Sequence, residues 1–151
     1  MGRRKLDVRD LRGDDVIDSR DVIARLDELE SDLADRESDL AAVAALDAAK
    51  EARDAAKEAL EAFRTDQQDE LVALRALVAE ASQCTDDWEH GATLIRERHF
   101  VKYAEQLADD IGAIDLNHKW PHNHIDWEAA ADELQGDYCA VDFDGETYFV
   151  R

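Results

Sequence analysis

The chain contains 151 residues, of which 38 are acidic and 18 basic, so its formal net charge at pH 7 is −20. This charge argues against a general binder of the nucleic-acid backbone, because such proteins need a basic face. No run of about 18 apolar residues exists, so no membrane-spanning helix and no membrane partner are predicted. Two cysteines are too few for a disulfide scaffold, and the basic start lacks the apolar stretch of a secretory signal. A cytoplasmic protein is therefore expected.

Charge and composition divide the chain into three regions. Residues 1–13 carry five basic and two acidic residues, a pattern typical of a basic flexible arm. Residues 14–87 consist mainly of good helix formers and predict a coiled-coil helical region. Residues 88–151 combine helix and hairpin signals and predict a small acidic α+β domain. The expected fold is mainly α: a long helical coiled coil or helical hairpin, followed by an ααββ domain.

The helical region has neither glycine nor proline between Gly13 and Gly91. Asp18 or Ser19 is suited to cap its start. Apolar residues then recur at alternating steps of four and three, the heptad rule of coiled coils. A stripe this narrow needs a partner helix, and self-association into a dimer or larger oligomer is the simplest source. The residues predicted to mediate it are Leu26, Leu29, Leu33, Leu40, Val43, Leu60 and Phe63.

A break in this region is predicted near residue 65. Thr65 and Gln68 have the spacing of a capping box, which marks the start of a helix. A second helix is therefore expected from about residue 67 to residue 81. If the break is a tight turn, the two helices fold back on each other, and otherwise they form one long rod.

Residues 88–151 contain signals for two helices and a hairpin. One apolar face runs from Phe100 to Ile111 and is followed by a glycine, which predicts a helix that ends there. Asp126 is suited to cap a second, short helix. Two alternating segments around Asp144-Gly145 predict a β-hairpin with a two-residue turn. The three tryptophans are expected in the core of this unit.

Sites for metal or catalytic chemistry are weakly indicated. His118, His122 and His124 lie close enough in sequence to bind zinc, but their spacing matches no closed structural site, so no metal and no cofactor are assigned. Acidic pairs suited to acid–base chemistry arise by chance in so acidic a chain, and no catalytic motif is present. We therefore expect no enzyme. Cys139 is interpreted as a buried thiol and Cys84 as exposed.

The acidity has two explanations, imitation of DNA and solubility in concentrated salt. Aspartate exceeds glutamate and arginine exceeds lysine, which is typical of salt-adapted proteins. Residues 105–146, however, contain twelve acidic residues and a single basic one, Lys119. If carboxylates imitate phosphates in this chain, this stretch is the best candidate. Direct binding of nucleic acid by such a surface is not expected.

Residues 88–96, 103–114, 120–121, 125–130 and 136–138, together with the Asp-Gly hairpin, carry a resemblance. They are similar to a family of small acidic proteins of viruses and mobile elements, whose C-terminal part resembles ArdA-type antirestriction proteins. The similarity covers about residues 88–151, and the antirestriction link depends mainly on residues 125–130 and 136–138. ArdA-type proteins are elongated acidic dimers that imitate bent DNA and block type I restriction enzymes. The resemblance implies that Trp127 and Tyr138 pack internally while neighbouring carboxylates face a partner. With the acidic stretch, it gives these partner-binding residues: Glu105, Asp109, Asp110, Asp115, Asp126, Glu128, Asp132, Glu133 and Asp137.

The function expected from these observations is a non-enzymatic, virus-encoded antidefence protein in the host cytoplasm. It would bind a host restriction enzyme, or another nucleic-acid enzyme, as an acidic DNA mimic. The alternative is a coiled-coil structural or adaptor protein of a virus or salt-adapted organism, whose acidity serves solubility.

Overall fold

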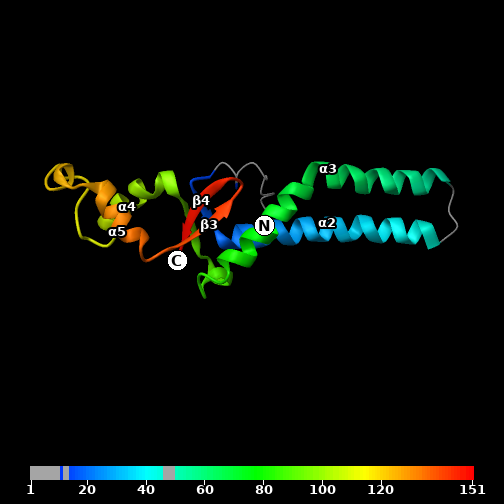
Figure 1. The fold of residues 1–151 in the computed structure, drawn as a ribbon, viewed down its shortest axis with the longest axis horizontal. Helices are drawn as coiled ribbons and strands as arrows, with labels where there is room; N and C mark the ends of the chain where they lie inside the picture. The colour runs from blue at the N-terminus through cyan, green and yellow to red at the C-terminus, as the bar shows by residue number, and fades with distance from the viewer. Residues whose placement is uncertain (1–10, 12–13, 46–49) are drawn as a thin grey trace.

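The computed structural model describes residue 11, residues 14–45 and residues 50–151 (Figure 1). The predicted basic arm therefore lies outside the described residues, apart from Leu11. The helices are α2 (Ser19–Ala45), α3 (Lys50–Ala81), α4 (Phe100–Asp110) and α5 (Trp127–Gln135), and the strands are β1 (Val16–Asp18), β2 (Thr93–Arg96), β3 (Cys139–Phe143) and β4 (Glu146–Val150). Short 3-10 turns are η1 (Trp88–His90), η2 (Glu97–His99) and η3 (His122–His124). Within these ranges, no helix has the length and apolarity needed to cross a membrane.

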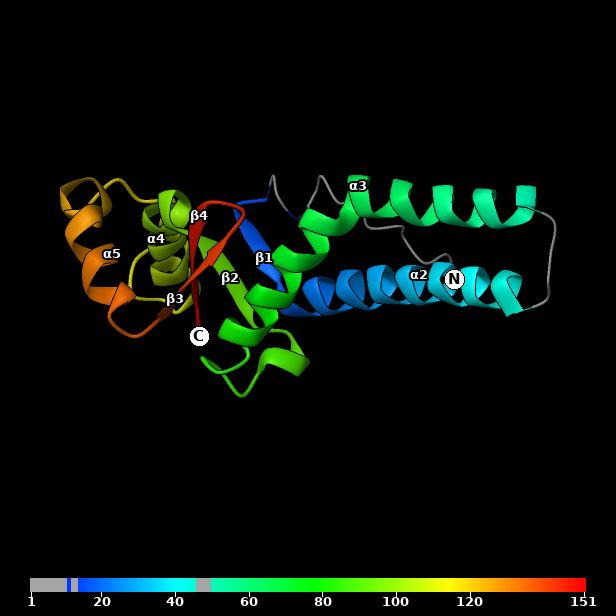
Figure 2. The same ribbon diagram turned by 45° about the vertical axis from the view of Figure 1, so that its right-hand side comes forward.

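Helices α2 and α3 lie side by side as an antiparallel hairpin that projects from the sheet (Figures 1 and 2). Asp18 caps the start of α2, as predicted, by accepting a hydrogen bond from the Arg20 amide at 2.9 Å. The apolar stripes of the two helices face each other, and an ion pair between Arg75 and Glu30 at 2.9 Å links them at the surface. The structure thus has a helical hairpin, one of the two arrangements expected, but its helices separate between Ala45 and Lys50 and not near residue 65.

The predicted break near residue 65 is wrong. Helix α3 runs without interruption from residue 50 to residue 81, so its second half ends where predicted, but its first half continues through Thr65. The Thr65 hydroxyl donates to the Glu61 carbonyl oxygen one turn back at 2.9 Å and caps nothing. The apparent capping box is a chance spacing inside a helix whose apolar stripe packs on α2.

Replacing Thr65 with alanine tests this interpretation. A threonine that caps a helix contributes about 1 kcal/mol to stability, whereas a threonine inside an exposed helix costs a few tenths relative to alanine. Because Thr65 is exposed in mid-helix, we expect the variant to unfold at a slightly higher urea concentration than the parent chain. A clear loss of stability in urea denaturation would contradict the continuous helix.

The sheet has the order β1-β2-β4-β3, and every neighbouring pair is antiparallel. Strand β1 precedes the helical hairpin and pairs with β2 after it, with Ile17 opposite Leu94. The hairpin is therefore inserted between two adjacent strands of one sheet. The sequence indicated neither β1 nor β2, so the expected ααββ unit lacks two of the four strands, and the sheet joins the predicted regions 14–87 and 88–151.

The two faces of the sheet bury separate hydrophobic clusters. On one face, residues such as Leu94, Val141 and Tyr148 pack against the base of the helical hairpin. On the other face, Ile95 and Phe149 pack against α4 and α5. The sheet is thus the middle layer between the hairpin and a lobe formed by residues 100–138, which we call the α4–α5 lobe (Figure 2).

The local signals of the C-terminal part are largely confirmed. Asp126 caps α5 by accepting a hydrogen bond from the Ala129 amide at 3.1 Å. Asp144 and Gly145 form the hairpin turn with φ values of 52° and 78°, which favour Asp-Gly at these positions. The expected burial of Ile111 and of all three tryptophans is wrong, because Ile111 is 70% exposed and Trp120 is 75% exposed. Both belong to the connection between α4 and α5.

The cysteines form a disulfide, which corrects their interpretation as separate thiols. The bond joins Cys84, just after α3, to Cys139 at the start of β3. The two cysteines are 55 residues apart, so no local sequence pattern indicated that they pair. The disulfide ties the end of the helical hairpin to the edge of the sheet, where both residues pack against the larger cluster.

Candidate functional site

The α4–α5 lobe carries all nine carboxylates predicted to face a partner. It lies at the end of the molecule opposite to the end of α2 and the start of α3 (Figure 1). An aromatic cluster fixes it to the sheet: the Phe100 ring lies 5.2 Å from that of Tyr138 and 5.1 Å from that of Phe149. Partly buried Trp127 packs in the same lobe with its indole nitrogen donating to the His122 carbonyl oxygen at 3.2 Å. Tyr138 and Trp127 therefore both take part in the packing of this lobe.

Three of the nine carboxylates shape the backbone of the lobe. Asp109 accepts a hydrogen bond from the Leu116 amide at 3.1 Å, and Asp126 caps α5. Asp115 accepts from the Asn117 amide at 2.8 Å and lies 2.8 Å from Nδ1 of His118. The Asn117 hydrogen bond, assisted by His118, lowers the pKa of Asp115 below its ordinary value. These side chains are occupied by the fold before any partner binds.

Two further carboxylates have partners in α4 or beside it. Glu105 is partly buried with its carboxylate 3.5 Å from Nε2 of His122, and Asp110 accepts a hydrogen bond from Gln106 at 3.0 Å. The remaining four are exposed and, within the described part of the chain, have no side-chain hydrogen bond or ion pair; they are Glu128, Asp132, Glu133 and Asp137. They occupy α5 and the turn after it, and form the part of the predicted set that is open to a partner.

The three histidines do not come together. His118 is paired with Asp115, while His122 lies between Glu105 and Trp127. Across residues 14–45 and 50–151, no group of three or more histidine, cysteine, aspartate or glutamate side chains is arranged to hold a metal ion. His118 thus serves as the neighbour of a carboxylate, and His122 as the neighbour of a carboxylate and of an aromatic ring.

The residues predicted to mediate self-association lie along the seam of the helical hairpin. Leu29, Leu60 and Phe63 are buried there, and the other four are partly buried: Leu26, Leu33, Leu40 and Val43. Their partner helix belongs to the same chain, so the apolar stripe is covered without a second copy. Self-association through these residues stays a prediction.

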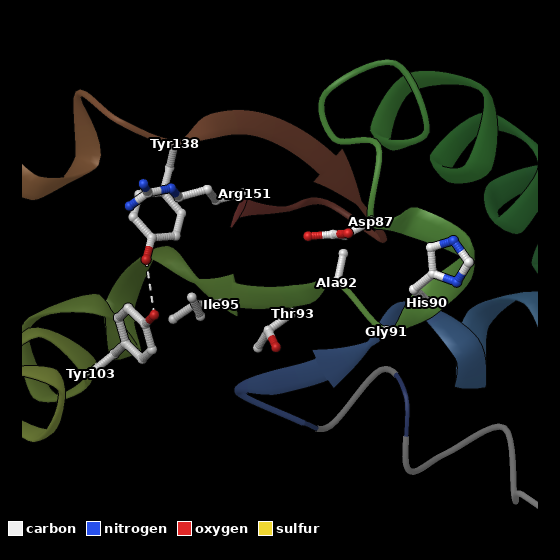
Figure 3. Close-up of a pocket in the computed structure, with 9 residues that line it drawn as sticks. All are labelled: Asp87, His90, Gly91, Ala92, Thr93, Ile95, Tyr103, Tyr138 and Arg151. Atoms are coloured by element: carbon white, nitrogen blue, oxygen red, sulfur yellow. Dashed lines mark hydrogen bonds between the residues drawn. The ribbon is translucent and has the colours of Figure 1, made fainter. Parts of the chain in front are cut away.

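A pocket of about 530 Å³ lies beside β2, between the lobe and η1 (Figure 3). Tyr103 and Tyr138 form one end, with their hydroxyl oxygens 2.8 Å apart, and Asp87 and His90 lie towards the other end. Burial, together with the hydrogen bond between the Tyr103 and Tyr138 hydroxyls, raises the pKa of Tyr103 far above its ordinary value, so its hydroxyl stays protonated. The remaining lining residues are Gly91, Ala92, Thr93, Ile95 and Arg151.

This pocket was not predicted from the sequence. Its walls come from η1, β2, α4, the segment before β3 and the residue after β4, and no local motif marks such an assembly. The lining offers one guanidinium, one carboxylate, the imidazole of His90 and the hydroxyls of Thr93, Tyr103 and Tyr138, which suit the binding of a small polar molecule. No nucleophile with an adjacent base is among these residues.

Comparison of the chain with protein-family models, with curated proteins and with solved structures found no match.

Proposed function

We propose that this chain is a non-enzymatic antidefence protein that occupies the basic nucleic-acid groove of a host restriction enzyme or a similar enzyme. The observation that carries the proposal is the exposed set of four carboxylates on and after α5, in a lobe whose only basic residues are Lys102 and Lys119. The chain would act by electrostatic competition with DNA, which gives fast association that weakens as salt rises.

The density of charge along α5 supports this proposal. Five carboxylates occur between Asp126 and Asp137. At a rise of about 1.5 Å per residue, these positions span roughly 16 Å, or about one charge per 3 to 4 Å. One strand of duplex DNA carries about one charge per 3.4 Å of helix axis. The segment from Asp126 to Asp137, which comprises α5 and its flanking residues, therefore has a density of charge along its axis similar to that of one DNA strand.

The test is inhibition of DNA cleavage by a type I restriction enzyme. The test variant replaces Glu128, Asp132 and Glu133 with their amides, and we expect it to inhibit about tenfold less well than the parent chain at low salt. The matched control replaces the exposed hairpin residues Asp35, Asp39 and Glu58 in the same way, which leaves the net charge of the two variants equal. The control is expected to inhibit like the parent chain. Equal inhibition by both variants, or none by the parent chain, would contradict the proposal.

The alternative proposal is a coiled-coil adaptor whose acidity serves solubility. The observation in its favour is that exposed carboxylates also cover α2 and α3, interleaved with arginines, far from the α4–α5 lobe. The same experiment separates the two proposals. If only overall charge matters, the α5 variant and the hairpin control lose solubility in salt equally, and neither differs from the parent chain in any effect on the enzyme.

A further inference from the structure

Trp120 is largely exposed to solvent and belongs to neither hydrophobic cluster of the described chain. Its side chain is 75% exposed, the highest value among the large exposed hydrophobic residues of the described chain, whereas Trp88 is 4% exposed and Trp127 is partly buried. Tryptophan is enriched among the residues that dominate the binding energy of interfaces, so a tryptophan exposed to this extent is a candidate contact residue. Ile111, 70% exposed, belongs to the same connection between α4 and α5.

The loop that carries Trp120 has a defined conformation. The carbonyl oxygen of Lys119 accepts a hydrogen bond from the Asn123 amide at 2.8 Å, and that of Pro121 accepts from the His124 amide at 2.9 Å. Both neighbours of Trp120 are thus held by turn hydrogen bonds. The loop begins where Asp109 binds the Leu116 amide and ends where Asp126 caps α5. A ring presented on a fixed loop loses less conformational entropy when it binds than one on a mobile segment.

The charges around this loop restrict what can cover Trp120. Residues 105–137 contain nine carboxylates and one lysine, so a nucleic acid or an anionic lipid surface would be repelled. A second copy of the lobe would bring the same negative charges together. Charge complementarity therefore selects a protein surface with basic residues around an apolar socket.

We propose that Trp120 is the apolar anchor of the acidic lobe, and that it inserts into an apolar socket surrounded by lysine or arginine residues on a partner protein. The inference rests on the proposed function, because that function supplies the basic partner. It adds the contact between Trp120 and the apolar socket, which gives the interaction its specificity. The carboxylates of α5 would guide the encounter, while Trp120 would slow dissociation once the surfaces meet.

Two synthetic peptides can test the anchor without the natural partner. They have equal length and equal lysine content, but one carries leucines between the lysines and the other carries serines. The dissociation constants of both are measured by fluorescence anisotropy at physiological salt. We expect the parent chain to bind the leucine peptide about tenfold more tightly than the serine peptide, and we expect Trp120→Ala to lose most of that preference. Tryptophan emission should shift to shorter wavelength on binding in the parent chain and not in the variant.

Val72→Ala provides the matched control, because Val72 is a 54% exposed apolar residue on α3, the helix on the opposite side of the sheet from the lobe (Figure 2). It should keep the full preference for the leucine peptide. The proposal is overturned if the parent chain binds both peptides equally, or if Trp120→Ala retains the preference for the leucine peptide. It is also overturned if the parent chain binds neutral lipid vesicles through Trp120 and does not bind the peptides. The two proposals can fail separately. If the preference for the leucine peptide depends on Trp120 but the chain inhibits no restriction enzyme, the role of Trp120 as an anchor is supported and the proposed function is rejected.

Discussion

Replacing Glu70 with alanine is expected to lower the free energy of unfolding by about 3 kcal/mol, because it removes the buried partner of a buried arginine and leaves only the exposed Glu28 to pair with it. Glu70 on α3 is 5% exposed and Arg25 on α2 is 8% exposed, and their side chains meet at 3.0 Å. Burial disfavours the charge of Arg25, but hydrogen bonds to Glu70 and Glu28 outweigh this effect and raise its pKa. Urea denaturation followed by circular dichroism measures the loss.

Two further variants test whether the loss of stability in Glu70→Ala comes from the burial of its ion pair with Arg25. Glu30→Ala breaks the exposed pair with Arg75 and should cost less than about 1 kcal/mol. Replacing Arg25 and Glu70 together with methionines should recover most of the stability lost by Glu70→Ala, since no buried charge then remains. If Glu30→Ala and Glu70→Ala destabilise the chain equally, the buried pair does not contribute as the structure indicates.

The second large effect is expected from the disulfide between Cys84 and Cys139. Replacing both cysteines with serine should lower the free energy of unfolding by about 2–4 kcal/mol, because the bond closes a long loop and restricts the unfolded chain. The bond also holds the end of α3 against β3, so its removal should loosen the base of the helical hairpin first. Hydrogen exchange of the amides after α3 is the measurement that locates this effect.

A reducing agent gives the control for the disulfide. Reductant should shift the urea midpoint of the parent chain towards that of the doubly substituted chain and should leave the substituted chain unchanged. A parent chain whose midpoint does not respond to reductant, although both thiols are shown to be reduced, would rule out a stabilising role.

Local signals predicted the elements that depend on neighbouring residues. Asp144-Gly145 specified the β-hairpin because its turn needs positive φ values, and Asp126 specified the start of α5 because its side chain bonds an amide three residues later. The capping-box spacing of Thr65 and Gln68 is also a local signal, but the helix start that it predicted is wrong. A capping box is only one side-chain spacing, and the packing of α3 along α2 outweighed it.

The candidate site was predictable in its charge and not in its geometry. The acidic stretch of residues 105–146 was evident from composition, but composition does not tell a carboxylate that shapes a turn, such as Asp109, from an exposed one, such as Asp132. The exposure of Trp120 ran against the ordinary expectation that a tryptophan is largely buried. The exposure of this ring becomes evident only from the three-dimensional course of the loop between α4 and α5 and from the hydrogen bonds that hold it.

The sequence by itself determined that the chain is mainly helical, strongly acidic and ended by a tight β-hairpin, since these properties follow from residue type and short-range spacing. The tertiary structure decided which segments meet: β1 with β2, Cys84 with Cys139, and Arg25 with Glu70 across a separation of 45 residues. Such contacts bring together residues far apart in the chain, and each segment is by itself compatible with several partners. The free energy of burying a common core selects one of them.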